Sequence, residues 1–270
     1  MILRLYWWKE FRKDKFQNYG DLMSRYIVKK LSGKIILDSR SRFNKFYKKI
    51  TKKHYIVIGS IIGSANKHSI VWGSGIISRK QEVGNANFLA VRGPKTRERL
   101  LELGYNVPEV YGDPAILLPL FIKNNVPKKY KIGIIPHFVD YEAVKNALEH
   151  DNRITVINLL TKNVEFTTKQ ILECEQIVSS SLHGVIVPHA YGIPALWVKF
   201  SEKLSGDNIK FYDYYLSVNV HFTNEKLINP QDLSFQLLEE ILSNGNATLL
   251  PEEEYLKKMQ EKLLESCPFN

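Results

Sequence analysis

The sequence predicts an α/β protein of two domains that face each other across a cleft. Short β-branched runs alternate with segments of helical periodicity in both halves of the chain, a pattern typical of βαβ units and parallel sheets. A basic, proline-containing stretch over residues 123–131 separates the halves, and this composition is typical of a linker. We therefore expect an N-terminal domain over residues 1–125 and a C-terminal domain over residues 126–270.

The composition is ordinary for a soluble globular protein, with 44% hydrophobic and 24% charged residues in a chain of 270. Its two cysteines, Cys174 and Cys267, lie far apart without metal-ligand spacing, which favours a reducing compartment. No run approaches the roughly 20 apolar residues that cross a bilayer. The N-terminal segment lacks the apolar core of a signal peptide. These features predict a cytoplasmic protein.

The net charge of +10 is concentrated in the first 53 residues. Such a basic face attracts nucleic acid, an anionic membrane or small anionic substrates. Nucleic acid is disfavoured, because the sequence lacks the motifs of RNA-binding sheets and zinc fingers. A peripheral membrane contact is one prediction, since aromatics and cations that suit the headgroup level alternate at Trp7, Trp8, Arg12, Lys13, Lys15 and Phe16. In the alternative, the tryptophans pack in the core or the cleft and the lysines only solubilise the chain.

The first half contains several expected strands, each followed by a polar or glycine-rich turn. The strands are expected over residues 2–8, 34–37, 55–58, 70–72, 88–91 and 110–115, with a helix over 22–33. Asn18 or Asp21 is expected to cap this helix, and both also lie after a first strand, where α/β proteins place ligand groups. The glycine-serine loops over residues 59–64 and 73–75 are neither P-loops nor dinucleotide-binding fingerprints.

Arg92 lies where an expected strand ends and a helix begins, after Val91 and before Gly93-Pro94. A guanidinium beside a helix N-terminus can hold a phosphate or carboxylate through paired hydrogen bonds. The alternative is an ion pair with a neighbouring acid. Both interpretations stay open at this point.

In the second half, the segment over residues 177–198 carries the clearest signal. Ser179, Ser180 and Ser181 follow an expected strand, and we expect them to cap a helix that begins near Leu182. This places His183 in the first helical turn, where backbone N–H groups bind anions and an imidazole can exchange a proton. The alternative is a histidine that only faces solvent.

The other elements of this half are expected strands over residues 131–137 and 154–160 and helices over 141–150 and 168–173. His137 ends the first of these strands and is expected to look into the same cleft as His183. His189 is expected on the opposite side of its helix. The tail over residues 251–264 alternates acids and lysines at helical spacing, which predicts a solvated surface helix.

Five motifs occur in the order found in one family: residues 18–21 (NYGD), 91–94 (VRGP), 112–115 (GDPA), 179–184 (SSSLHG) and 190–194 (AYGIP). Over residues 16–200 the chain resembles the polysaccharide pyruvyl transferases. The resemblance implies two Rossmann-like domains in a layout similar to GT-B glycosyltransferases. It also implies transfer of the pyruvyl unit of phosphoenolpyruvate to two hydroxyls of one sugar. The product would be a pyruvate ketal on a bacterial exopolysaccharide or capsule, or on its lipid-linked precursor.

The resemblance also implies roles for individual residues. The family's Arg-Leu-His triplet is Ser181-Leu182-His183 here, so the histidine matches and the arginine does not. His183 is expected to be the proton donor, and Asp21 or His137 the base near the acceptor hydroxyl. The donor is expected to be held by Arg92, by the N–H groups after Ser180 and Ser181, and by a lysine of the basic first half. The substrate-binding set is completed by Asn18, Gly20 and His137. No metal cluster is visible, and phosphoenolpyruvate is a substrate, so we expect no cofactor.

Two other functions stay open. The first is a GT-B-type glycosyltransferase that uses a nucleotide sugar, which bound nucleotide or sugar-nucleotide hydrolysis would reveal. The second is a non-enzymatic protein that binds anionic glycans or RNA through the basic first half. Such a protein would bind polymer with a steep salt dependence and turn over no donor.

Overall fold

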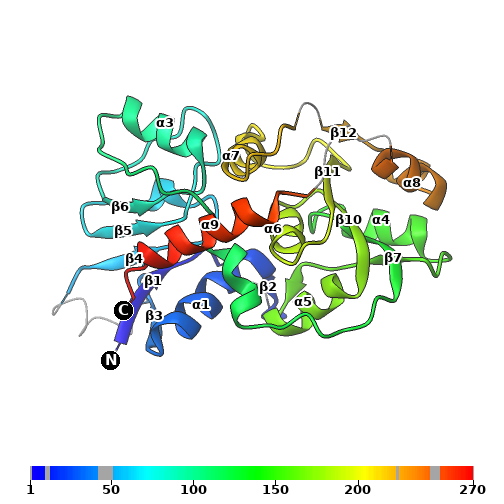
Figure 1. Ribbon diagram of the computed structural model, residues 1–270, viewed down its shortest axis with the longest axis horizontal. Coiled ribbons are helices and arrows are strands. Elements are labelled where there is room, and N and C mark those ends of the chain that lie inside the picture. Colours follow the sequence, from blue (N-terminus) through cyan, green and yellow to red (C-terminus); the bar gives the residue numbers. More distant parts are fainter. Residues whose placement is uncertain (1, 10–12, 42–50, 223–224, 244–249, 270) are drawn as a thin grey trace.

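Two parallel five-stranded sheets organise the computed structural model, which describes residues 2–9, 13–41, 51–222, 225–243 and 250–269 (Figure 1). The first sheet has the strand order β3-β1-β4-β5-β6 and the second the order β12-β11-β10-β7-β8. Every pair within these sheets is parallel. The expected α/β class with parallel sheets is therefore confirmed. The domain boundary near residue 125 stays a prediction.

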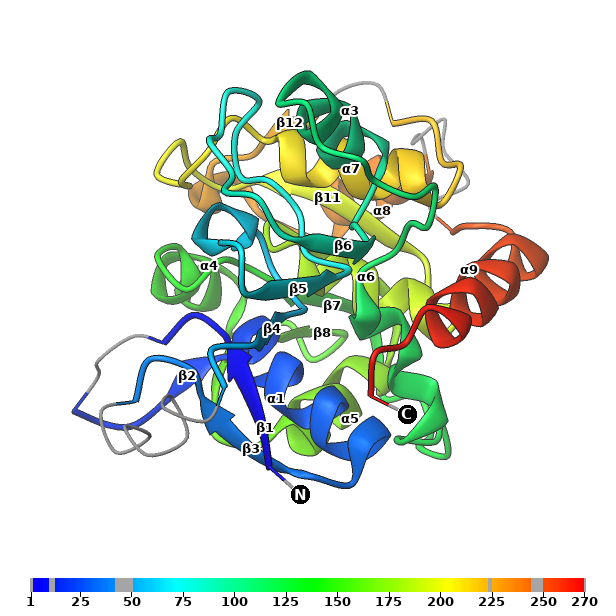
Figure 2. The ribbon, with the colours of Figure 1, turned by 90° about the vertical axis from the view of Figure 1, so that its left-hand side faces the viewer.

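The first sheet can be followed from β3 to β6 in Figure 2. Its strands are β1 (Ile2–Tyr6), β3 (Ile35–Asp38), β4 (His54–Ile56), β5 (Ser69–Trp72) and β6 (Asn87–Ala90). Its helical segments are α1 (Tyr19–Ser32), α3 (Pro94–Glu102) and the 3-10 turns η2 (Ile62–Ser64) and η3 (Pro114–Leu120). The predicted end of α1 at Gly33 is confirmed, since Gly33 adopts φ 64°, a conformation that glycine reaches without strain.

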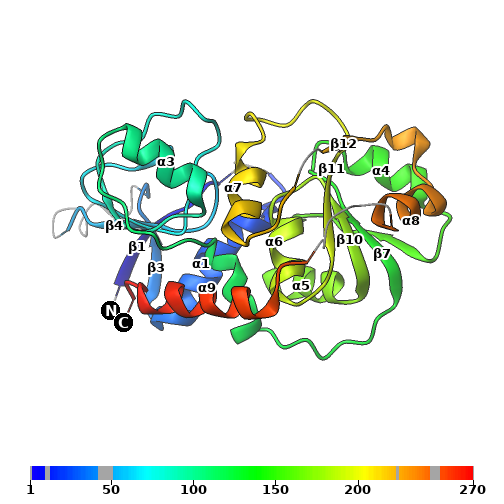
Figure 3. The ribbon, with the colours of Figure 1, turned by 45° about the horizontal axis from the view of Figure 1, so that its top comes forward.

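The second sheet is covered on both faces, with α5 and α6 on one side and α4 and α8 on the other (Figure 3). Its strands are β7 (Tyr130–Ile135), β8 (Ile154–Val156), β10 (Cys174–Ser179), β11 (Ala195–Lys199) and β12 (Lys226–Leu227). The helices are α4 (Tyr141–Leu148), α5 (Val164–Leu172), α6 (His183–Ala190), α7 (Ile209–Ser217) and α8 (Phe235–Ser243), and η4 (Pro230–Asp232) is a 3-10 turn. Two covered faces explain why the central strands β7, β10 and β11 are buried over most of their length.

The two halves share one hydrophobic core. A single cluster of buried side chains includes Trp72 of β5, Leu117 of η3 and Val185 of α6. The short strands β2 (Gln17–Asn18) and β9 (Leu160–Thr161) also join the halves as an antiparallel pair. The strand β2 ends directly before α1, so its pairing with β9 ties the start of this helix to the second half.

The last helix, α9 (Glu253–Glu265), returns to the first sheet (Figure 1). The indole N–H of Trp72 donates to the carbonyl of Leu263 at 3.1 Å, and Phe269 packs edge-on against Trp72. The predicted helix is confirmed, but its solvated character is only half right, because Leu256, Met259 and Leu263 are buried. Its apolar residues recur at helical spacing and form a stripe toward the core.

Three other predicted elements differ in detail. Residues 110–115 form no strand, and only Tyr111 makes an isolated bridge to Val91. The chain leaves the sheet there because Asp113 caps η3 and Pro114 begins it. The expected strand over 154–160 divides into β8 and β9, and the expected helix over 168–173 begins earlier, at Val164, with Asn163 as its cap. Within the described ranges, no helix has the length and apolar character needed to cross a bilayer.

Candidate active site

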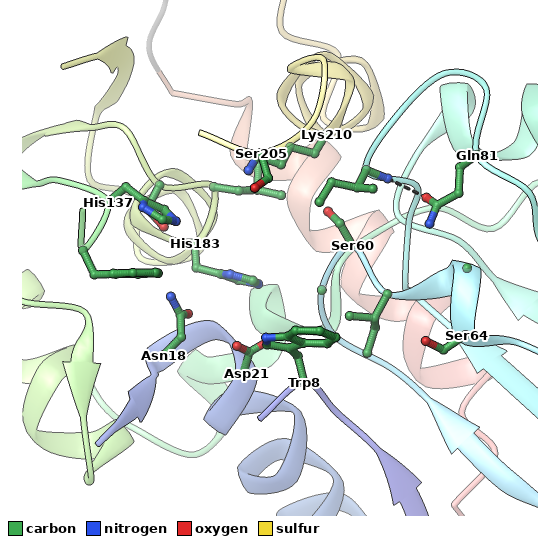
Figure 4. A pocket seen from close by; sticks show the side chains of 17 residues that line it. Trp8, Asn18, Asp21, Ser60, Ser64, Gln81, His137, His183, Ser205 and Lys210 are labelled. Carbon is green, nitrogen blue, oxygen red and sulfur yellow. Dashed lines mark hydrogen bonds between the residues drawn. The ribbon is translucent and has the colours of Figure 1, made fainter. Parts of the chain in front are cut away.

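A cavity of about 530 Å³ lies between residues of the two halves of the chain. The first half contributes Trp8, Asn18, Asp21 and the loop over residues 59–64. The second half contributes His137, Phe138, Ser181, Leu182, His183, Ser205 and Lys210. Figure 4 shows Asn18, Asp21 and Trp8 on one side of His183, with Ser205 and Lys210 on the other. The cavity thus brings together His183, Asp21, Asn18, Ser181 and His137 of the expected site.

The serine turn does not cap α6, contrary to the sequence prediction. Leu182 is the N-cap residue and makes no side-chain capping bond. The Ser179 hydroxyl donates instead to the carbonyl of Ile135 at 2.8 Å, and the Ser180 hydroxyl accepts from the backbone N–H of His137 at 2.8 Å. The hydroxyls therefore tie the turn to the end of β7. As a result Ser180 lies behind the cavity wall, whereas Ser181 lies on it.

His183 faces a buried carboxylate on η3. Its Nε2 lies 3.5 Å from Oδ2 of Asp113, which is completely buried. The other carboxylate oxygen, Oδ1, accepts from the backbone N–H of Ala115 at 3.0 Å. Within the described part of the chain, neither Nε2 nor Oδ2 has a hydrogen-bond partner of ordinary length. The imidazole of His183 is therefore the group that faces the unpaired oxygen of this buried carboxylate.

Sequence reasoning missed Asp113 as a site residue. An aspartate before Pro114 is already explained as the cap of a 3-10 turn, so its local position alone suggests no second role. The motif over residues 112–115 was the signal that pointed to it. Only the packing of η3 against α6 shows that the second carboxylate oxygen reaches His183.

Gly20 lies against the imidazole ring of His183. A Cβ added to Gly20 would overlap Nδ1 and Cε1 of that ring. The Gly20 N–H donates to the Asn18 side chain at 3.0 Å, so Asn18 is the cap of α1 and Asp21 is not. Gly20 was expected among the substrate-binding residues, and the structure places it behind His183 rather than on the cavity wall. Its observed contribution is the space that the ring occupies.

Arg92 is completely buried and does not line the cavity. Its Nε donates to Oδ2 of Asp213 at 3.0 Å, and its Nη1 donates to the hydroxyl of Ser60 at 2.6 Å. Asp213 also accepts from the backbone N–H and the hydroxyl of Thr96. The ion pair left open by the sequence is therefore present. Arg92 contacts the cavity wall through its hydrogen bond to Ser60, which lies on that wall.

Lys210 lies in the first turn of α7 and is the only lysine or arginine among the described residues that line the cavity. Burial, and secondarily the charge of Arg92, lowers the pKa of Lys210 to about 8. Burial also lowers the pKa of His137 to about 4, with a smaller effect from the Lys210 charge. At neutral pH the cavity therefore holds a charged lysine and a neutral histidine. A lysine of the basic first half was expected to hold the donor. No local sequence pattern identified Lys210 as a residue of the cavity.

Trp7 and Trp8 pack in the core and the cavity, which was the alternative to a membrane contact. Trp7 is buried in the shared core, and Trp8 lines the cavity while half of its surface is exposed. His189 is buried as well and bonds to the Tyr214 hydroxyl at 2.9 Å, so it faces away from the cavity as expected. Arg12 lies outside the described residues.

The family model described as polysaccharide pyruvyl transferase matches residues 7–202. The chain belongs to the polysaccharide pyruvyl transferase family. An uncharacterized protein of Acanthamoeba polyphaga mimivirus is 36% identical over 205 residues, which cover 73% of this chain and 69% of the viral protein. The family match contains every site residue expected from the sequence. Lys210 and Asp213 lie beyond it.

Proposed function

We propose that the protein transfers the pyruvyl unit of phosphoenolpyruvate to two hydroxyls of one sugar, in a polysaccharide or its lipid-linked precursor, and releases phosphate. Membership of a transferase family supports the reaction class. The observation that carries the proposal is the position of His183, which lines the cavity while its Nε2 is held 3.5 Å from the buried Asp113. We further propose that the two halves are Rossmann-like domains in a GT-B-like layout, which the two parallel sheets and the cavity between them support.

The donor carries a phosphate and a carboxylate, and the second-half wall of the cavity suits both. The N-terminus of α6 opens at Ser181, Leu182 and His183, where backbone N–H groups and the helix dipole favour an anion. Lys210 adds a full positive charge. In the proposal Lys210 takes the place of the arginine that is missing before Leu182-His183.

Arg92 acts in this proposal as a positioning residue. It joins Asp213 on α7, the helix that carries Lys210, to Ser60 on the opposite wall. A buried guanidinium that is bonded on three sides fixes these elements relative to each other. The donor then contacts Lys210, and Arg92 holds α7 and the loop of Ser60 in place.

The chemistry begins with a proton. His183, which lines the cavity, protonates the methylene carbon of phosphoenolpyruvate. One sugar hydroxyl then forms a C–O bond to the central carbon, phosphate leaves with its bridging oxygen, and the second hydroxyl forms the second C–O bond. The two hydroxyl protons replace the proton of His183 and protonate the departing phosphate. Asp113 stabilises the imidazolium form before transfer.

For the base we propose Asp21. It lies on the same side of the cavity as Asn18 and Trp8 (Figure 4), across from Lys210 and the proposed donor site. His137, the other candidate, lies beside the Lys210 charge, which contributes to its low pKa. An acceptor sugar would lie on the first-half wall, with Trp8 as an exposed apolar surface for the ring.

The deciding experiment is incubation with phosphoenolpyruvate and a panel of synthetic and lipid-linked glycans. The proposal requires a mass gain of one pyruvyl group on the glycan and an equal release of phosphate. A parallel reaction with nucleotide sugars tests the alternative function. Glycosyl transfer without phosphoenolpyruvate would replace the proposal with a glycosyltransferase.

A lipid-linked acceptor implies contact with an anionic membrane surface. Lys13 and Lys15 are exposed, and Phe16 is partly exposed beside β2, whereas the buried Trp7 is unavailable. Each cation near such a surface contributes on the order of 1 kcal/mol. Sedimentation with anionic vesicles is expected to carry the protein down at low salt, and less so when Lys13 and Lys15 are both changed to glutamine. Equal binding to neutral vesicles would contradict this contact.

A further inference from the structure

A second cavity, of about 440 Å³, lies next to the first and has a different character. It occupies the face of the first sheet opposite α1, because Arg4 and Tyr6 alternate along β1 with Leu3 and Leu5, which pack with α1 in the core. Its described lining residues include no aliphatic side chain and no carboxylate. They are Arg4, Tyr6, Ser39, Arg40, Lys52, His54, Ser64, Asn66 and His68.

Arg4 is the buried cation of this cavity, with 7% of its surface exposed. Its two terminal nitrogens donate to the backbone carbonyls of Thr51 and Ser39 at 2.7 and 2.9 Å. Its Nε has no hydrogen-bond partner among the described residues. A buried guanidinium with neutral partners and an unused donor lacks the counter-charge that buried cations need.

The surroundings of His54 show the same excess of positive charge in this cavity. The register pairs Leu5 with Tyr55, so Arg4 and His54 are neighbours on one face. The pKa of His54 is lowered by burial and by the nearby Arg4 and His68. The adjacent carboxylate, Asp38, lies outside the lining, where it pairs with Lys9 at 2.8 Å and with Nε of Arg40 at 3.6 Å. The charges inside the cavity therefore favour an anion from solution.

Ser64 lines both cavities, and its hydroxyl donates to Tyr6 at 2.9 Å. An anion in the second cavity would therefore lie beside the first-half wall of the reaction cavity. That wall holds Asp21 and Trp8, whereas the proposed donor site of Lys210 and α6 belongs to the second half. The second anion site thus lies beside the proposed acceptor side.

We propose that this basic cavity binds a diphosphate that links the acceptor sugar to its carrier. The inference rests on the proposed function, because it assigns the anion to the acceptor. The cations Arg4, Arg40 and Lys52 suit a group with several negative charges and many acceptor oxygens. A nucleoside diphosphate sugar and a polyprenyl diphosphate sugar share this chemistry, and the experiment distinguishes them.

The direct test is calorimetric binding of inorganic pyrophosphate to the whole protein without donor. Lys52→Glu is expected to weaken binding by about 10- to 100-fold, as for loss of a hydrogen bond to a charged group. Lys53→Glu is the matched control, since it changes the net charge equally while Lys53 lies over Tyr55 and outside the lining. An equal loss in both variants would show a general charge effect and overturn the proposal. Loss in Lys210→Met with unchanged binding in Lys52→Glu would place the anion in the reaction cavity and also overturn it.

The source of the diphosphate is tested with three acceptors that carry the same sugar: a nucleoside diphosphate sugar, a polyprenyl diphosphate sugar and a carrier-free glycoside. Lys52→Glu is expected to raise the KM of one diphosphate-linked acceptor by about tenfold or more relative to Lys53→Glu, and that acceptor identifies the carrier. An equal change for the carrier-free glycoside would overturn the proposal. If no acceptor gains a pyruvyl group, the proposed function fails, whereas the pyrophosphate measurement still decides whether the cavity binds a diphosphate.

Discussion

The carboxylate of Asp113 and the imidazole of His183 lie 3.5 Å apart, although they come from different halves of the chain. Asp113 caps η3 and His183 begins α6, and these two segments pack against each other in the shared core. Among the residues that the structure describes, Oδ2 of Asp113 has no hydrogen-bond partner, and it faces Nε2 of His183.

Asp113→Asn is expected to lower kcat by on the order of 10²–10⁴-fold. The amide keeps the shape and the bond to Ala115 but removes the charge that stabilises the imidazolium. Pyruvyl transfer by mass spectrometry measures the effect, and the thermal midpoint shows whether the fold persists. Near-native turnover in a folded variant would remove Asp113 from the mechanism.

His183→Ala is expected to abolish transfer while the protein stays folded and still binds phosphoenolpyruvate. His189→Ala is the matched control on the same helix. His189 is buried and bonded to Tyr214, so its loss is expected to lower stability rather than the kcat of the folded fraction. If His183→Ala retains turnover, the proton comes from another group.

Gly20→Ala is expected to lower kcat by tenfold or more, because the new methyl group would displace the His183 ring. Alanine is favoured over glycine in a helix by about 1 kcal/mol, so the substitution is expected to have little effect on stability. A double variant with His183→Ala supplies the control, and it should be no less active than His183→Ala alone. Full activity in Gly20→Ala would show that the ring position is unimportant.

The lowered pKa of Lys210 is expected to make the kcat/KM for phosphoenolpyruvate depend on pH. Its pKa of about 8 means that the free enzyme carries the binding charge below pH 8 and loses it above. The kcat/KM for phosphoenolpyruvate is therefore expected to be level near pH 7 and to fall as pH rises through about 8. Lys210→Arg should keep kcat/KM level above pH 8, because a guanidinium stays charged. Lys210→Met should lower it at every pH below 8. A fall that persists unchanged in Lys210→Arg would come from another group.

Loss of the Arg92–Asp213 ion pair is expected to lower the free energy of unfolding. Arg92→Ala leaves a buried carboxylate without its cation, and such a loss typically destabilises by about 3–5 kcal/mol. Denaturant unfolding measures the change in the free energy of unfolding. Lys95→Ala, which removes an exposed pair with Glu98 on α3, is the control and should change it by at most about 1 kcal/mol. If Arg92→Ala leaves stability unchanged and raises only the KM for phosphoenolpyruvate, Arg92 binds the donor directly.

Local patterns determined much of this protein from the sequence alone. Hydrophobic periodicity gave most strands and helices, since it reports which face of an element is buried. Gly33 ended α1 as predicted because a left-handed residue at that position favours glycine. His137 and Ser181 follow the neighbouring parallel strands β7 and β10, and His183 begins the next helix, so these residues lie at one edge of the second sheet.

The tertiary structure decided which partners those residues meet. In the sequence, Asp113 looks like a helix cap, and Lys210 and Asp213 look like ordinary helical residues. Only packing between distant segments brings Asp113 to His183, Lys210 to the cavity and Asp213 to Arg92. The same packing moved Arg92 from the expected donor site to a buried ion pair and turned the serine hydroxyls toward β7. Sequence periodicity predicts which face of a helix or strand is buried. Which residues then meet across the core depends on how separate elements pack.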